Sequence, residues 1–258
     1  MIRYGTRKVD GTIIASLLIV LLLSGCITET NRSKLKADPE KSLQAHIDLG
    51  LGYLSKGDLG RAKEKLGRAM ELDSNSAVVH NAYGLMFQVE DENGLAEKHF
   101  RRAIRLDSKF ALARNNYGAF LFAEGRFNEA IEQFKIGVKD PFYRARSQVY
   151  ENLGVCYLRI DDKKSAEEAF DHAIALNPRQ LRSLLEQAVL VFEQQDYTRA
   201  RSLYRRYIGM VDQSARSLWL GIRVERIFEN RNEVASYALR LKNIFPASPE
   251  YKLYQESL

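Results

Sequence analysis

The side chains best suited to covalent or metal chemistry in this chain are two cysteines, Cys26 and Cys156, and four histidines. No two histidines stand four residues apart beside a glutamate, the spacing that predicts a zinc enzyme. The sequence also has neither a glycine-rich phosphate loop nor a serine-nucleophile elbow. We therefore expect no catalytic residue, no metal site, no cofactor and no small-molecule substrate. The one cysteine whose neighbours indicate chemistry is Cys26.

An apolar run precedes Cys26. Aliphatic and small residues fill positions 13–23, and Arg3, Arg7 and Lys8 stand before them. A positive segment followed by a short apolar segment is typical of a secretion signal, because the run falls well short of the roughly 20 residues that a membrane-spanning helix needs. We therefore interpret the N-terminus as a signal peptide and not as a transmembrane anchor.

The residues that end this run, Leu23-Ser24-Gly25-Cys26, resemble the lipobox of bacterial lipoproteins. The resemblance implies that a peptidase removes residues 1–25 and that the Cys26 thiol carries a diacylglyceryl group, with acyl chains such as palmitate. An ordinary signal peptide that happens to contain a cysteine is the alternative. With Cys26 lipidated, no pair is left for a structural disulfide, and we expect Cys156 to be a small buried hydrophobic residue.

Residues 26–41 are polar and show no apolar periodicity, so we interpret them as a flexible tether between the lipid and a folded domain at residues 42–258. The whole chain is 45% hydrophobic and 28% charged, which suits a globular domain with a substantial core. Its basic residues, which give a net charge of +6, are interleaved with acidic ones. The sequence therefore predicts neither a nucleic-acid partner nor a polybasic patch for lipid.

A repeat of about 34 residues occupies the folded domain. In the first five units a small residue and an alanine twelve positions later recur together, which indicates one structural template instead of a set of unrelated helices. The small residues are Gly50, Gly84, Gly118, Gly154, Ala188 and Gly221, and the alanines are Ala62, Ala96, Ala130, Ala166, Ala200 and Ala235. In the last unit the interval is 14, so we expect Arg231-Asn232 to lengthen its turn and the unit to cap the array.

The units resemble tetratricopeptide repeats, as in LGLGYLSKGDLGRAKEKLGRAMELD and LGVCYLRIDDKKSAEEAFDHAIALNP. The resemblance implies an all-α superhelix of about six helix-turn-helix units, stacked so that neighbours bury each other's apolar faces. We place the units at residues 43–76, 77–110, 111–146, 147–180, 181–213 and 214–248. The longer interval of 36 between Gly118 and Gly154 locates an insertion at residues 139–143, which is either a harmless bulge or functional.

Repeats of this kind present a concave surface lined by their first helices, on which an extended peptide or a helix can lie. Projecting the template predicts a mostly apolar lining, with asparagines that could bond to the backbone of a ligand. The predicted lining is Ile47, Leu51, Leu54, Asn81, Leu85, Val89, Asn115, Ala119, Phe122, Val155 and Leu158. Exposed apolar positions there favour a protein partner, and the alternative is that an adjacent helix or the tether covers them.

Several stretches are more specific than a generic repeat. They read DLGLGYLSKGDLGRAKEKL, NNYGAFLFAEGRFNEAIEQF, ENLGVCYLRIDDKKSAEEAFDHAIALNP and ARSLWLGIRVERIF, together with the insertion KDPFYRARSQVYENLG. Over essentially the whole chain they resemble the type IV pilus biogenesis and stability lipoproteins, known as the PilF or PilW family.

That resemblance implies a pilotin, an outer-membrane lipoprotein that faces the periplasm, binds a subunit of the pilus secretin and promotes its localisation and multimerisation. The expected partners are thus an apolar secretin segment in the groove and the membrane through the lipid anchor. Two alternatives stay open. One is another envelope scaffold, serving outer-membrane protein assembly or peptidoglycan synthesis, and the other is an enzyme whose site the sequence does not reveal.

Overall fold

The computed structural model describes residues 38–258, and the chain divides into two units, Met1–Asp38 and Pro39–Leu258. The predicted signal peptide, the lipidation site Cys26 and the predicted tether up to residue 37 lie outside the described residues. Within the described part the fold is all-α, with thirteen helices. None of those helices combines the length and the apolar composition that crossing a bilayer requires.

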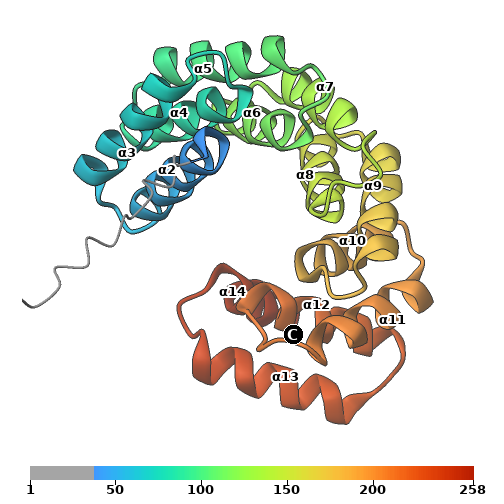
Figure 1. The fold of residues 1–258 in the computed structure, drawn as a ribbon. Helices are drawn as coiled ribbons and strands as arrows, with labels where there is room; N and C mark the ends of the chain where they lie inside the picture. Colours follow the sequence, from blue (N-terminus) through green and yellow to red (C-terminus); the bar gives the residue numbers. More distant parts are fainter. Residues whose placement is uncertain (1–37) are drawn as a thin grey trace, which may run out of the picture. The chain divides into compact units, whose positions relative to one another are not determined.

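Twelve of the helices form six pairs, and each pair packs against the next (Figure 1). The pairs are α2 (Pro39–Leu54) with α3 (Leu59–Leu72), α4 (Ala77–Val89) with α5 (Asn93–Leu106), α6 (Ala111–Ala123) with α7 (Phe127–Gly137), α8 (Arg146–Arg159) with α9 (Lys163–Leu176), α10 (Leu181–Glu193) with α11 (Tyr197–Ile208), and α12 (Ala215–Ile227) with α13 (Arg231–Ile244). The last helix, α14 (Pro249–Glu256), packs on α12 and α13. First helices of successive pairs also contact one another, as expected of a tetratricopeptide-repeat superhelix.

Helix α2 begins at Pro39, inside the segment that the sequence predicted to be tether. Proline is favoured at the first helical position, where its missing N–H would have no partner in any case. Glu40 lies in the first turn, where a carboxylate interacts favourably with the helix dipole. Residues 39–41 therefore belong to the folded unit, and the predicted tether was three residues too long.

A residue with positive φ marks the turn inside each helix pair. These residues are Gly57, Asp91, Gly125, Asp161, Gln195 and Glu229, at intervals of 34, 34, 36, 34 and 34 residues. A left-handed residue just after a helix ends it, because the backbone can no longer continue the right-handed ladder. The six turns therefore give the register of the repeat from the backbone itself.

In the first four pairs, a glycine seven residues before the turn faces a large side chain of the second helix. A Cβ atom on Gly84 would lie 2.6 Å from the ring of Phe100, and one on Gly118 or Gly154 equally close to the ring of the corresponding phenylalanine, Phe134 or Phe170. In the first pair Leu66 packs against Gly50 in the same way. Because the first helix has no side chain there, the ring of the second helix lies directly against its backbone.

The sixth pair reverses that order of sizes. Counted from Glu229, the position of the glycine holds Ile222 on α12, and the position of the phenylalanine holds Ala238 on α13. Ile222 is fully buried and Ala238 is 8% exposed, and both belong to one core cluster with Tyr204 of the fifth pair. The two helices thus pack large against small, as in the other pairs, but with the large residue on the first helix.

This reversal corrects the sequence prediction for the last unit. Gly221 is one residue out of register, and its missing Cβ instead leaves room for the Tyr204 hydroxyl of the preceding pair. Ala235 is exposed and does not pack between the helices. The turn is not lengthened at Arg231-Asn232, because residues 228–230 join α12 to α13 just as residues 90–92 join α4 to α5.

The insertion lies in residues 138–145, between α7 and α8. Asp140 Oδ1 accepts a hydrogen bond from the Phe142 backbone N–H at 2.9 Å, the same turn that Asp73 makes after α3. Arg146 Nε donates to the Val138 carbonyl at 2.8 Å and closes the loop. The extra residues follow this turn, and they leave the Phe142 side chain 90% exposed.

Candidate functional site

Of the eleven residues predicted to line the groove, eight are exposed or partly exposed, and Ile47, Asn81 and Val155 are buried. Leu51, Leu54, Leu85, Asn115 and Phe122 are partly exposed, and Val89 is 55% exposed. Ile47 is 1% exposed and Asn81 is 2% exposed. These two belong to the packing between the first helices and are not available to a ligand.

The burial of Ile47 has a simple cause. It packs with Leu66 and Ala69 of α3 and with Val79 and Ala82 of α4, so it fills the space where the first two pairs meet. Stacked repeats need such residues, because no single pair can cover its own apolar face. The prediction that Ile47 lines the groove was therefore wrong.

The two predicted asparagines, Asn81 and Asn115, each form a hydrogen bond with an asparagine of the next first helix, so these groups are not free for a ligand backbone. Asn116 Nδ2 donates to Asn81 Oδ1 at 3.0 Å, and Asn152 Nδ2 donates to Asn115 Oδ1 at 3.2 Å. Each bond joins the first helix of one pair to the first helix of the next. A buried amide needs such a partner, since an unpaired one is costly. These bonds fix the spacing of α4, α6 and α8.

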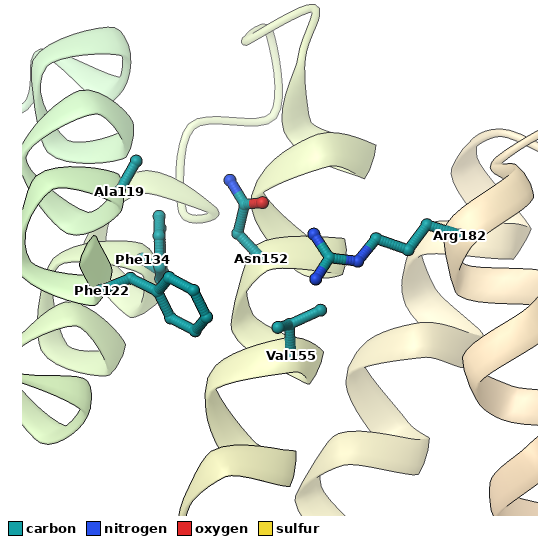
Figure 2. Close-up of a pocket in the computed structure, with 6 residues that line it drawn as sticks. All are labelled: Ala119, Phe122, Phe134, Asn152, Val155 and Arg182. Atoms are coloured by element: carbon teal, nitrogen blue, oxygen red, sulfur yellow. The ribbon is translucent and has the colours of Figure 1, made fainter. Parts of the chain in front are cut away.

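A pocket opens where α6, α7, α8 and α10 come together (Figure 2). It has a volume of about 70 Å³, and its lining consists of Ala119, Phe122, Phe134, Asn152, Val155 and Arg182. Figure 2 shows the Arg182 side chain reaching from α10 toward Asn152 and Val155, with the Phe122 ring on the opposite side. Ala119, Phe122 and Val155 were predicted to line the groove, so this part of the predicted surface forms a real concavity.

The rim of this pocket is cationic. The Arg159 guanidinium lies over the Phe122 ring, 5.9 Å from its centroid. Arg182 forms no ion pair within residues 38–258. An apolar wall with an amide and two guanidinium groups at its edge can hold an aliphatic or aromatic side chain and hydrogen-bond the acceptors beside it.

Two lining residues, Asn152 and Arg182, were not predicted from the sequence. The signal for Arg182 was present, since Arg216 lies 34 residues later at the same position of the template, on the same face of the next first helix. The lining was predicted mainly from apolar spacing in the first four units, so Arg182 and Arg216 of the last two units were not included.

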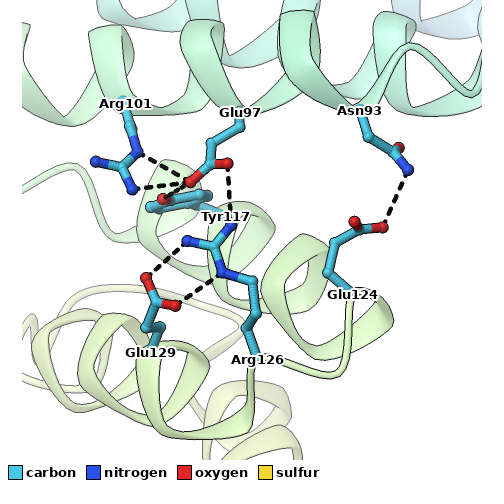
Figure 3. Close-up of polar contacts among 7 residues, drawn as sticks. All are labelled: Asn93, Glu97, Arg101, Tyr117, Glu124, Arg126 and Glu129. Carbon is cyan, nitrogen blue, oxygen red and sulfur yellow. Dashed lines mark hydrogen bonds and ion pairs between the residues drawn. The ribbon is translucent and has the colours of Figure 1, made fainter.

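A cluster of charged residues elsewhere could be mistaken for a catalytic site (Figure 3). Glu97 on α5 accepts hydrogen bonds from Arg126, Tyr117 and Arg101 at 2.8 to 2.9 Å. Hydrogen bonding to Arg126 lowers the pKa of Glu97 to about 2. A carboxylate that is fully paired and ionised near neutral pH is a poor general acid or base, so we assign this cluster to holding α5, α6 and α7 together.

The remaining chemically active side chains are also in packing environments. His80 Nδ1 lies 3.0 Å from His99 Nδ1, and the His99 ring packs against His80, Tyr83 and Phe87. Cys156 is buried, as predicted, and burial raises the pKa of its thiol to about 12, which makes it unreactive. Within residues 38–258 no group of histidine, cysteine, aspartate or glutamate side chains is arranged to hold a metal ion.

Comparisons with known proteins agree with this arrangement. Residues 91–144 and 152–215 match a tetratricopeptide-repeat family model. The type IV pilus assembly protein PilF of Pseudomonas aeruginosa is 39% identical over 248 residues, which cover 95% of this chain and 98% of that protein.

Two solved structures are similar as well. The structure of Pseudomonas aeruginosa PilF has a TM-score of 0.81 at 39% identity, covering 85% of this chain and 99% of the other. That of PilW, a type IV pilus biogenesis factor, has a TM-score of 0.69 at 22% identity, covering 83% and 98%. At that lower identity the similarity to PilW concerns the fold. The chain therefore belongs to the PilF family of type IV pilus proteins and is built of tetratricopeptide repeats.

Proposed function

We propose that the protein is a pilotin: a lipid-anchored protein of the outer membrane, facing the periplasm, that binds a secretin subunit and promotes secretin localisation and multimerisation. The observation that carries the proposal is the 39% identity to PilF over nearly the full length of both chains. The exposed apolar residues of the first helices support it, because they give the protein a surface for a partner. The proposed role is that of a binding protein, and none of its steps requires catalysis.

Anchoring would come from Cys26. Leu23-Ser24-Gly25-Cys26 has the form of a lipobox, and each buried methylene of an acyl chain contributes about 0.8 kcal/mol of membrane affinity. Two or three chains therefore hold a protein firmly. The groove would then meet secretin subunits at the membrane where they assemble, and the higher local concentration would favour ring formation.

The groove would bind an apolar segment of the secretin along the first helices. Val89 and Leu85 of α4, with Phe122 and Ala119 of α6, offer apolar contact, and the pocket beside Phe122 accepts one side chain. Covering such a segment keeps unassembled subunits from aggregating. This is a physical reason for a pilus system to use a repeat protein here.

A charge placed in this surface tests the proposal. Val89→Glu should weaken secretin binding about tenfold or more, because it places a carboxylate against an apolar ligand, and Val89 is exposed enough for the fold to survive. Leu95→Glu is the matched control, since Leu95 lies in the same pair on the second helix and is 39% exposed. Binding should be measured with purified secretin, and circular dichroism should show both variants folded. Equal affinity for the two variants would refute the groove assignment.

The anchor has its own test. Cys26→Ala should release the protein from membranes on fractionation and leave the secretin mislocalised or poorly multimerised. Unchanged fractionation would contradict the lipid anchor. Recovery of barrel-assembly subunits or cell-wall synthases without secretin, in a pull-down of the tagged protein, would replace the pilotin proposal with that of another envelope scaffold.

A further inference from the structure

The last two first helices carry arginines where the earlier ones carry apolar or neutral residues. Arg182 on α10 and Arg216 on α12 share one template position, which Val78 holds on α4 and Leu112 on α6. Arg182 also lines the pocket beside Phe122, so this position faces the groove. The row of arginines therefore continues the predicted groove into the fifth and sixth pairs.

Two further arginines of α12 lie over aromatic rings. The Arg223 guanidinium lies 4.7 Å from the ring centroid of Phe192 and 5.6 Å from that of Trp219. Arg226 lies 6.0 Å from the Trp219 ring and 5.5 Å from that of Tyr254 on α14. A guanidinium that lies over a ring keeps the N–H groups at its edge available to an acceptor. One of those groups on Arg226, at Nη1, already donates to Ser257 Oγ at 2.9 Å.

Two carboxylates of α10 near these arginines are paired with other residues. Glu186 pairs with Arg216 through two bonds of 2.6 and 2.8 Å, and Glu193 pairs with Lys163 at 3.1 Å. Within residues 38–258 this leaves Arg182, Arg223 and Arg226 without a carboxylate partner. In that part of the chain none of the three guanidinium groups forms an ion pair, and the Glu193 carboxylate acts on Arg223 only through space.

Of the three arginines, Arg223 has the least favourable surroundings for its charge and its N–H donors. Its Nε is buried and has no hydrogen-bond partner within the described residues. Burial also lowers the pKa of its guanidinium, which means that the surroundings disfavour the charge. An acceptor that reached Arg223 would relieve both effects, because a buried unpaired donor loses its hydration and gains nothing in return.

We propose that Arg182, Arg223 and Arg226 bind an acidic segment of a partner protein, with its carboxylates paired to the guanidinium edges. Charge complementarity indicates an anionic occupant, and planar guanidinium groups suit carboxylates because they can bond to both oxygens. The adjoining pocket of about 70 Å³ has room for a side chain and not for an acyl chain, which favours a peptide over a lipid. This inference does not require the partner to be a secretin.

The test uses the full-length protein in neutral detergent and a labelled peptide with blocked ends in which glutamates alternate with leucines. A second peptide carries glutamine in place of each glutamate. Fluorescence anisotropy should show that the glutamate peptide binds at least about tenfold more tightly, and that added salt removes the difference. Equal affinity for the two peptides would overturn the proposal.

Variants then locate the site. Arg182→Gln should weaken binding of the glutamate peptide several-fold without affecting the fold, because Arg182 is exposed and forms no ion pair within residues 38–258. The double variant Arg223→Gln/Arg226→Gln should lose about tenfold or more. Arg206→Gln is the control, since Arg206 is an exposed arginine of α11 without an ion pair in that part of the chain. An equal loss in Arg206→Gln would show a general charge effect and contradict the assignment.

A vesicle-binding experiment tests lipid headgroups as the alternative ligand. If vesicles containing phosphatidylglycerol bind the protein, and Arg182→Gln abolishes that binding while the glutamate peptide does not compete, the surface recognises lipid headgroups and the proposal is wrong. The expected result is that neither Arg182→Gln nor the glutamate peptide changes vesicle binding.

Discussion

The first four helix pairs and the last pair meet the same packing requirement with opposite residues. In α2 to α9 the first helix gives up its side chain at one position, and a leucine or phenylalanine of the second helix fills the space. In α12 and α13 the first helix carries Ile222 and the second carries Ala238. What the repeat preserves is the summed volume at the contact, since a core must be filled from one side or the other.

Their inner surfaces differ as well. Along α4 and α6 the exposed positions are apolar or amide residues, whereas α10 adds the exposed Arg182 and α12 adds two arginines that lie over aromatic rings. The same scaffold thus presents two chemistries in sequence, one suited to an apolar ligand and one to an anionic ligand. The two regions also differ in the burial of their ion pairs. The Glu225 side chain in the last pairs is 1% exposed, whereas the Glu97 side chain in the earlier pairs is 24% exposed.

The largest expected effect concerns Glu225. It joins α11 to α12 through Arg201, whose Nε lies 2.9 Å from Oε1, and it accepts a bond from Asn230 at 3.1 Å. Glu225→Ala should lower the free energy of unfolding by about 3–5 kcal/mol, because Arg201, Arg205 and Asn230 all lose the one buried acceptor that they share. Urea unfolding followed by circular dichroism measures this. A loss below about 1 kcal/mol would show that the last pairs do not depend on a buried ion pair.

The reversed pair gives an effect of intermediate size. Ile222→Ala should cost about 2–4 kcal/mol, because Ala238 is too small to fill the cavity that the change leaves. The double variant Ile222→Gly/Ala238→Phe restores the order found in the earlier pairs. It should be less destabilised than the sum of the two single variants, and a double-mutant cycle measures that coupling. Strict additivity would mean that the two positions do not form one contact.

The smallest effect is expected at Glu97, and it depends on pH. Arg126 lowers the pKa of Glu97 from 4.5 to about 2, so the carboxylate stabilises the fold fully above pH 4.5 and loses this contribution as the pH falls toward 2. Glu97→Gln should cost about 1–2 kcal/mol at neutral pH. The difference from the parent protein should shrink across that acid range.

A matched variant sharpens the measurement. Glu132→Gln removes an exposed carboxylate 3.5 Å from Lys135 on α7, and it should change the free energy of unfolding by less than about 0.5 kcal/mol at any pH. If the two variants lost the same amount, the cluster around Glu97 would be no more than a surface ion pair.

The repeat itself could be predicted because the same pattern of small residues recurs in five units of the sequence. Glycine or alanine and then alanine twelve residues later report a close approach of two helices, and no other arrangement explains their joint recurrence. For the sixth unit, the same pattern predicted the wrong contact residues. A search for small residues finds Gly221 and Ala235, whereas the structure puts Ile222 and Ala238 at the contact, because volume can be exchanged between the two helices without altering the backbone.

The candidate site could be predicted only in outline. Leu51, Leu85, Val89 and Phe122 were found at partly exposed positions because their spacing puts them on one side of the first helix. Ile47 has that spacing too and is buried. Helical spacing gives the side of a helix but not the neighbour that packs on it, and that neighbour comes from another unit.

By itself, the sequence determined that the protein is a stack of helix pairs with apolar first helices, since periodicity, turn residues and small residues act over short stretches of chain. Only the tertiary structure decided which of those apolar residues are free to meet a partner and which arginines stand without a carboxylate. Both depend on residues of the neighbouring repeat, such as Val155 near Arg182 or Glu186 beside Arg216, and their proximity exists only once the pairs have stacked.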